Sequence, residues 1–193
     1  MNIGDFMSKY YSMNVAGIDC DLQLCPVTED LYIGAFVMFG KPKLTENCAK
    51  QLLALAPEYD YLITAEAKGI PLAYEMAKQH GDDNYFVARK KPKLYMQNIF
   101  EVDVQSITTE GFQKLYLDGN DAEIIKGKRI LIVDDVISTG QSLAAIEKLV
   151  NAAGGIIVGK MAVLAEGASQ NRDDLVYLGK LPLFNADGTV KND

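Results

Sequence analysis

The chain has 193 residues, 49% of them hydrophobic and 23% charged, which is enough to bury a substantial core in one compact domain. Its net charge of -7 and pI near 4.8 argue against a surface built to bind nucleic-acid phosphates. The chain has three cysteines without a Cys-x-x-Cys spacing and a single histidine, which argues against a disulfide framework and a zinc site. It has neither a signal-peptide pattern nor an apolar run long enough to span a membrane, so we expect a cytoplasmic protein.

The first part of the chain predicts extended structure and then a helix. Residues 1–42 contain an alternating stretch at 19–24 and a run rich in β-formers at 31–39. Thr45 could cap a helix that extends through Ala56, and Pro57 would end it.

From residue 61 onward, strands and helices alternate. The stretch from Lys90 to Glu123 is less regular, with two β-rich pieces at 102–108 and 113–117. Elsewhere the expected strands are 61–64, 85–88, 129–133 and 156–164, and the expected helices are 69–80 and 143–153. This alternation predicts an α/β fold with a mostly parallel central sheet and helices on both faces.

Two aspartates follow the strongest strand, and a turn rich in hydroxyls and glycine follows them. Asp134 and Asp135 are placed where open parallel sheets bind ligands, beyond the carboxyl ends of the strands. Adjacent carboxylates can accept hydrogen bonds from a vicinal diol, such as the 2- and 3-hydroxyls of a ribose. The turn Ser138-Thr139-Gly140-Gln141-Ser142 opens a helix, whose N–H groups and dipole favour a phosphate. Together they suit a 5-phosphorylated ribose; the alternatives are an ordinary turn with solvated acids and a phospho-receiver domain.

The segment Ile130–Ser142 resembles the signature of the type I phosphoribosyltransferases, which binds 5-phosphoribosyl-1-pyrophosphate (PRPP). The resemblance implies that Asp134 and Asp135 bind the ribose hydroxyls as the catalytic pair. It assigns the 5-phosphate to Ser138, Thr139, Gly140, Gln141 and Ser142. It also implies the type I fold in a single domain over 1–193, with a core at about 43–166 and a small hood from about 1–42 and 167–185. Mg²⁺ would be carried mainly by PRPP rather than by protein ligands.

Two further segments resemble the pyrophosphate-binding parts of adenine phosphoribosyltransferases. Glu66-Ala67-Lys68-Gly69 lies between a strand and a helix, with Lys68 replacing the arginine of the family loop. Arg89, Lys90 and Lys93 follow the next strand, in a chain that is acidic overall. The alternatives are a capped helix start with a solvated lysine and a solvated basic turn. Beside the PRPP motif, binding of pyrophosphate is the better interpretation.

The resemblance covers about residues 58–166 and leaves the base and the proton-transfer group open. In the family, a flexible loop, here about 95–110, covers the reaction centre, and it offers Glu101, Asp103 and Glu110 without a recognisable motif. Two of the three motifs favour adenine as the base; xanthine or guanine, then orotate, are the alternatives. A non-catalytic PRPP-sensing regulator is the rival from another class. The family is commonly homodimeric, so we expect a homodimer.

Overall fold

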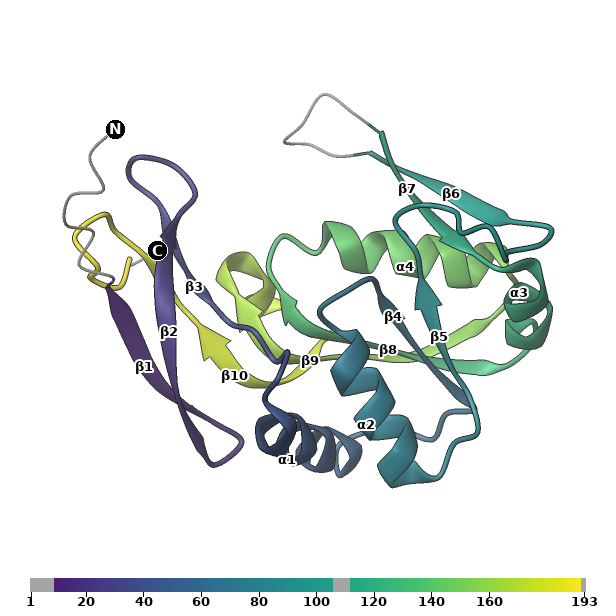
Figure 1. The fold of residues 1–193 in the computed structure, drawn as a ribbon, viewed down its shortest axis with the longest axis horizontal. Coiled ribbons are helices and arrows are strands. Elements are labelled where there is room, and N and C mark those ends of the chain that lie inside the picture. Colours follow the sequence, from purple (N-terminus) through teal and green to yellow (C-terminus); the bar gives the residue numbers. More distant parts are fainter. Residues whose placement is uncertain (1–8, 106–111, 192–193) are drawn as a thin grey trace.

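The computed structural model describes residues 9–105 and 112–191 (Figure 1). The helical elements are α1 (Pro42–Leu53), α2 (Ile70–His80), α3 (Gly119–Ile125), α4 (Gln141–Ala152) and the 3-10 helix η1 (Gly167–Asn171). The strands are β1 (Tyr10–Val15), β2 (Ile18–Pro26), β3 (Tyr32–Ala35), β4 (Tyr61–Ala65), β5 (Tyr85–Ala88), β6 (Phe100–Gln105), β7 (Phe112–Leu117), β8 (Arg129–Ile137), β9 (Ile156–Glu166), β10 (Val176–Leu181) and β11 (Leu183–Phe184).

A five-stranded sheet forms the centre of the molecule, in the order β10-β9-β8-β4-β5, and all four of its ladders are parallel. Helices α1 and α2 cover one face, and α4 covers the other (Figure 1). The predicted α/β fold, with a parallel sheet between two helical layers, is confirmed.

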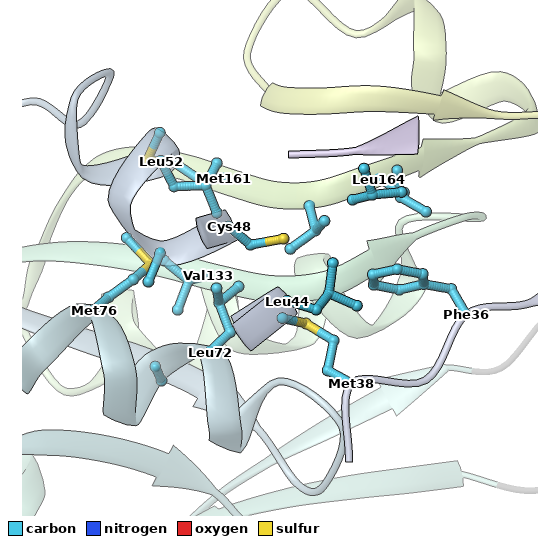
Figure 2. Packing of buried hydrophobic residues seen from close by; sticks show 14 of the residues in the cluster. Phe36, Met38, Leu44, Cys48, Leu52, Leu72, Met76, Val133, Met161 and Leu164 are labelled. Atoms are coloured by element: carbon cyan, nitrogen blue, oxygen red, sulfur yellow. The ribbon is translucent and has the colours of Figure 1, made fainter. Parts of the chain in front are cut away.

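The alternation of side chains along β8 divides the core between the two faces of the sheet. Leu131 and Val133 pack with α1 and α2, in the cluster seen in Figure 2. Ile130 and Ile132 point the other way and pack with α3, α4 and β7. All four side chains are fully buried, which is why this strand reads as an unbroken apolar run.

Strands β4 and β8 lie next to each other at the point where the chain reverses its direction of winding. From β4 the chain passes through α2 to β5 on one side, and from β8 it passes through α4 to β9 on the other. The two strands pair only from Tyr61–Ile63 to Ile130–Ile132 and have no paired residues beyond Ile63 and Ile132. Such a switch point is the expected ligand crevice of an open parallel sheet.

The hood is the second sheet, with four antiparallel strands in the order β1-β2-β3-β11. It lies beyond the β10 edge of the parallel sheet (Figure 1). Residues 167–185 were expected to belong wholly to the hood, but β10 pairs with β9 in the parallel sheet and only β11 pairs with β3. Strand β10 is a partly exposed edge strand, and its sequence does not indicate which sheet it joins.

Helix α1 and strand β8 have boundaries that differ from the sequence prediction, and one helix was not predicted. Helix α1 begins at Pro42, and Thr45 lies inside it, where its hydroxyl donates to the Lys41 carbonyl at 3.0 Å. Helix α3 was not predicted; Asp118 caps it by accepting from the Asn120 N–H at 3.0 Å. Strand β8 continues through the aspartate pair to Ile137, because β9 supplies pairing partners along its whole length.

Candidate active site

A cavity of about 210 Å³ opens at the crevice between β4 and β8. Eight of the residues predicted to bind PRPP line it: Glu66, Ala67, Lys68, Lys90, Asp134, Asp135, Gln141 and Ser142. Ala65, Leu115, Val136 and Ala145 complete the wall and were not predicted. Segments about seventy residues apart in the sequence therefore meet at one pocket.

The aspartate pair lies at the inner end of this cavity. Asp135 is only 4% exposed, and its Oδ2 has no hydrogen-bond partner within the described part of the chain. The Oδ1 of Asp134 accepts from the backbone N–H of Asp135 at 2.9 Å. Burial, together with the neighbouring Asp135 charge, raises the pKa of Asp134 to about 8, and burial also raises the pKa of Asp135. Both carboxyls therefore gain from hydrogen-bond donors or cations brought by a ligand.

We expect the free energy of unfolding to fall as the pH rises from about 4 to about 8. In this range the folded protein retains a proton on Asp134 that the unfolded chain has released, so deprotonation favours unfolding. Asp134→Asn should flatten this slope, by about 1–3 kcal/mol over the range, because solvent near the pair reduces the full linkage value. Urea unfolding at several pH values measures it. Asp83→Asn, at an exposed position, is the control; parallel curves for wild type and Asp134→Asn would contradict the burial argument.

The loop from Glu66 to Gly69 lies against the aspartate pair. A Cβ atom on Gly69 would lie 2.7 Å from Asp134 Oδ1 and would clash with Thr64 Oγ1. The Thr64 hydroxyl is fully buried at the end of β4 and has no partner among the described residues. Glycine at position 69 thus allows the loop and the acids to approach each other. Thr64 was not predicted, because nothing in the sequence distinguishes it from other polar residues near the end of a strand.

Glu66 holds two of the three predicted pyrophosphate-binding cations. Its Oε1 lies 3.4 Å from Arg89 Nη1 and 3.2 Å from Lys93 Nζ, and its Oε2 accepts from the Lys90 backbone N–H at 3.2 Å. Burial acts to raise the pKa of Glu66, but the bonds from Lys90 and Lys93 outweigh it and lower the pKa overall. Of Arg89, Lys90 and Lys93, only Lys90 lines the cavity. The structure therefore brings Lys68 and Lys90 to the pocket, while Arg89 and Lys93 pair with Glu66.

The turn from Ser138 to Ser142 begins α4 as predicted. Gly140 is the residue before the helix and has a φ of 75°, a left-handed conformation that favours glycine. Gln141 and Ser142 line the cavity, whereas Ser138, Thr139 and Gly140 form the turn that leads to it.

Three residues at the end of β9 and beyond it contact this turn and were not predicted. Ser169 donates to the Ser138 carbonyl, the buried Glu166 hydrogen-bonds with the Ser138 side chain, and Arg172 lies beside Gly140. Glu166 follows an apolar run along its strand, as Asp134 does, so the same signal could have identified it. Arg172 carries no such signal.

Of the three candidate proton-transfer acids, only Glu101 has a described side chain, and it does not line the cavity. Glu101 lies on β6 and pairs with Lys114 at 2.7 Å, on an exposed part of the hairpin with β7. The Asp103 side chain and the whole of Glu110 lie outside the described residues. None of the three is assigned a role.

A comparison with protein-family models matches residues 43–182 to the phosphoribosyl transferase domain. The chain belongs to the phosphoribosyltransferase family. Among curated proteins, this phosphoribosyltransferase is 31% identical to the hypoxanthine/guanine phosphoribosyltransferase of Methanococcus voltae over 135 residues, covering 70% of this chain and 68% of the relative. It is also 31% identical to the enzyme of that name from Methanothermococcus okinawensis over 154 residues, covering 76% and 80%.

Solved structures of adenine phosphoribosyltransferases share its fold. The enzyme from Thermoanaerobacter pseudethanolicus superposes with a TM-score of 0.68 at 19% identity, over 82% of this chain and 95% of that one. The Saccharomyces cerevisiae enzyme gives 0.67 at 22% identity, over 82% and 92%. These structures establish the type I fold, and the match to the family model together with the curated relatives establishes the transferase class. Within the described ranges, none of its helices combines the length and apolarity that crossing a bilayer requires.

Proposed function

We propose that this phosphoribosyltransferase joins a purine to the ribose 5-phosphate of PRPP and releases pyrophosphate, which would place it in purine salvage. The observation that carries the proposal is one cavity that joins the aspartate pair to two loops at helix N-termini, together with Lys68 and Lys90. A ring nitrogen of the purine would attack C1 while the C1–O bond to pyrophosphate breaks, and the ring N–H proton would be lost. In this assignment, the acids hold the ribose hydroxyls and the 138–142 turn holds the 5-phosphate.

The protein's contribution to this reaction is positioning and charge. The ribose becomes positively charged as pyrophosphate leaves, so carboxylates near the ring stabilise the transition state and lysines near the pyrophosphate stabilise the leaving group. The pocket contains both kinds of group: Asp134 and Asp135 on β8, and Lys68 and Lys90 on the two neighbouring loops. No nucleophilic side chain is needed for a direct displacement.

Mg²⁺ fits this site as a companion of PRPP. Carboxylate oxygens are the ligands that Mg²⁺ prefers, and the unpartnered Oδ2 of Asp135 is such an oxygen. Across residues 9–105 and 112–191, no group of three or more His, Cys, Asp or Glu side chains could hold a metal by itself. Mg²⁺ would therefore be carried mainly by PRPP, beside Asp134 and Asp135, and would neutralise charge on the pyrophosphate.

The choice of purine is the finer part of the proposal. The curated relatives, at 31% identity, are named for hypoxanthine and guanine, which makes these two bases the first candidates. Adenine is the second candidate, because the Glu66–Gly69 and Arg89–Leu94 segments resemble those of the adenine enzymes. Pyrophosphate release measured with PRPP, Mg²⁺ and each of adenine, hypoxanthine, guanine, xanthine and orotate separates these possibilities. Release with none of them, despite PRPP binding, would favour the PRPP-sensing regulator.

We expect Lys90→Gln to raise the KM for PRPP by about tenfold or more, since a hydrogen bond between charged groups contributes about 1.5–3 kcal/mol. Lys90 is the cation of the basic segment that lines the cavity. Lys91→Gln removes the same charge from the next residue, which is exposed and does not line the cavity, and should change the KM little. Equal effects of both variants would show that only the overall charge of the segment matters.

The remaining expectations from the sequence stay part of the proposal: a single domain whose hood covers the base, a homodimer and a cytoplasmic location. The exposed Leu94 and Tyr95, beside the basic segment, offer apolar surface for a second subunit. Light scattering of the purified chain tests the dimer.

A further inference from the structure

The turn proposed to bind the 5-phosphate carries no cation of its own. Its residues, Ser138 to Ser142, are hydroxyl, glycine and amide residues. Three acids lie near it: the aspartate pair at the end of β8, and Glu166, which is buried at the end of β9 and is bonded to Ser138. A phosphate dianion held there by N–H groups alone would face this negative charge. The Lys68 charge acts on all three acids and works to lower their pKa values, and a cation at the turn itself would further favour the phosphate.

Arg172 is placed to supply that charge. Its Nη1 lies 3.1 Å from the position that a Cβ atom on Gly140 would take. Its Nε and Nη2 donate to the two carboxylate oxygens of Asp174, at 2.9 and 2.8 Å. Nη1 has no hydrogen-bond partner within the described residues, and the side chain is 33% exposed. The guanidinium therefore turns its unused donor toward the turn.

A network of ion pairs holds this arginine in place. Lys160, on β9, lies 2.8 Å from Asp174 and 3.0 Å from Glu147, on α4. Glu147 also lies 3.9 Å from Arg172 Nη2. Lys160 comes from β9, Glu147 from α4 and Asp174 from the loop before β10, so Arg172 is fixed relative to the helix that the turn begins. A bidentate pair of this kind orients a guanidinium better than a single contact would.

A second contact fixes the same segment to the same turn. Ser169, on η1, is buried and donates to the Ser138 carbonyl. Ser169 and Arg172 therefore contact the turn at Ser138 and at Gly140. The segment from 166 to 174 therefore packs against the turn from outside the lined cavity, although it lies about thirty residues beyond the sequence motif.

We propose that Arg172 is a further binding residue for the 5-phosphate of PRPP, with Nη1 as the donor and Asp174 as the residue that orients it. The inference rests on the proposed function, because it assumes that the 138–142 turn receives the phosphate. It adds to that function a cation outside the family motif, and it predicts a preference for sugars that carry the 5-phosphate.

The test measures binding of ribose 5-phosphate and of pyrophosphate to the full chain by calorimetry. We expect Arg172→Gln to weaken ribose 5-phosphate binding by about 10- to 100-fold, the loss of one charge-assisted hydrogen bond, and to leave pyrophosphate binding unchanged. Arg172→Lys keeps the charge without the fork and should lose less. Lys148→Gln is the matched control, because it removes one positive charge from an exposed position on α4, next to Glu147 but outside the ion-pair network described above. Melting temperatures of all variants report folding.

The outcomes separate the inference from the proposed function. Wild-type affinity for ribose 5-phosphate in Arg172→Gln would overturn the inference, and so would an equal loss in Lys148→Gln or a parallel loss of pyrophosphate binding. Each of these leaves the proposed function standing if the wild-type chain still binds ribose 5-phosphate. If the wild-type chain binds neither ribose 5-phosphate nor PRPP, the proposed function falls, and the inference falls with it.

Discussion

Replacing both aspartates of the pair, Asp134→Asn with Asp135→Asn, is expected to reduce PRPP turnover by about 10²- to 10⁴-fold, the loss of two hydrogen bonds to charged groups. The carboxylates accept hydrogen bonds from the ribose hydroxyls, and their charge opposes the positive charge that develops on the ring. Asparagine keeps the size and one acceptor oxygen but loses the charge. The fold should remain intact, because burial and mutual repulsion already disfavour the ionised pair.

Turnover and folding have to be measured on the same preparation. Pyrophosphate release gives kcat and KM, and circular dichroism with thermal melting reports the fold. Asp19→Asn with Asp21→Asn, on the exposed face of β2, removes the same two charges at a distance from the cavity and should keep full activity. Activity within tenfold of wild type in a folded Asp134→Asn with Asp135→Asn variant would remove the aspartate pair from the mechanism.

The sequence was most informative along β8, where one strand is both the centre of the sheet and the element that carries the aspartate pair. The apolar run from Ile130 to Val133 predicted a strand buried on both faces, and the acids and the turn that follow it were placed at its carboxyl end. The structure adds that the strand continues through the acids to Ile137, because pairing with β9 does not depend on side-chain polarity. Local pattern was therefore enough to locate the candidate site.

Contacts between segments that are distant in the chain could not be predicted from the sequence. Arg89 and Lys90 are neighbours, yet one pairs with Glu66, more than twenty residues away, and the other lines the cavity. Successive side chains along the chain after β5 point in opposite directions, and Glu66 lies where it meets the Arg89 side chain and the Lys90 backbone. Arg172 follows an unremarkable polar turn, and only the packing of η1 against the 138–142 turn brings it to Gly140. A run of basic residues therefore predicts a cationic region, but only the fold shows which of its side chains line the cavity.

Gly69→Ala is expected to lower kcat/KM by about 10²-fold while costing only about 1–3 kcal/mol of stability. The backbone at Gly69 has a φ of -73°, which alanine adopts freely, so the effect arises from the added methyl group alone. That methyl would lie 2.7 Å from Asp134 Oδ1 and would clash with Thr64 Oγ1. Either the Glu66–Gly69 loop or the aspartate pair must move, and the two are proposed to hold the leaving pyrophosphate and the ribose of one substrate.

A second substitution tests this steric explanation. Thr64→Ala removes the hydroxyl that the new methyl group meets and leaves the Asp134 contact in place. Thr64→Ala with Gly69→Ala should therefore recover most of the lost melting temperature and only part of the lost kcat/KM. Full activity in Gly69→Ala would show that the loop and the acids do not act on one ligand. Recovery of neither quantity in the double variant would show that contact with Asp134, rather than with Thr64, controls the spacing of the two halves of the site.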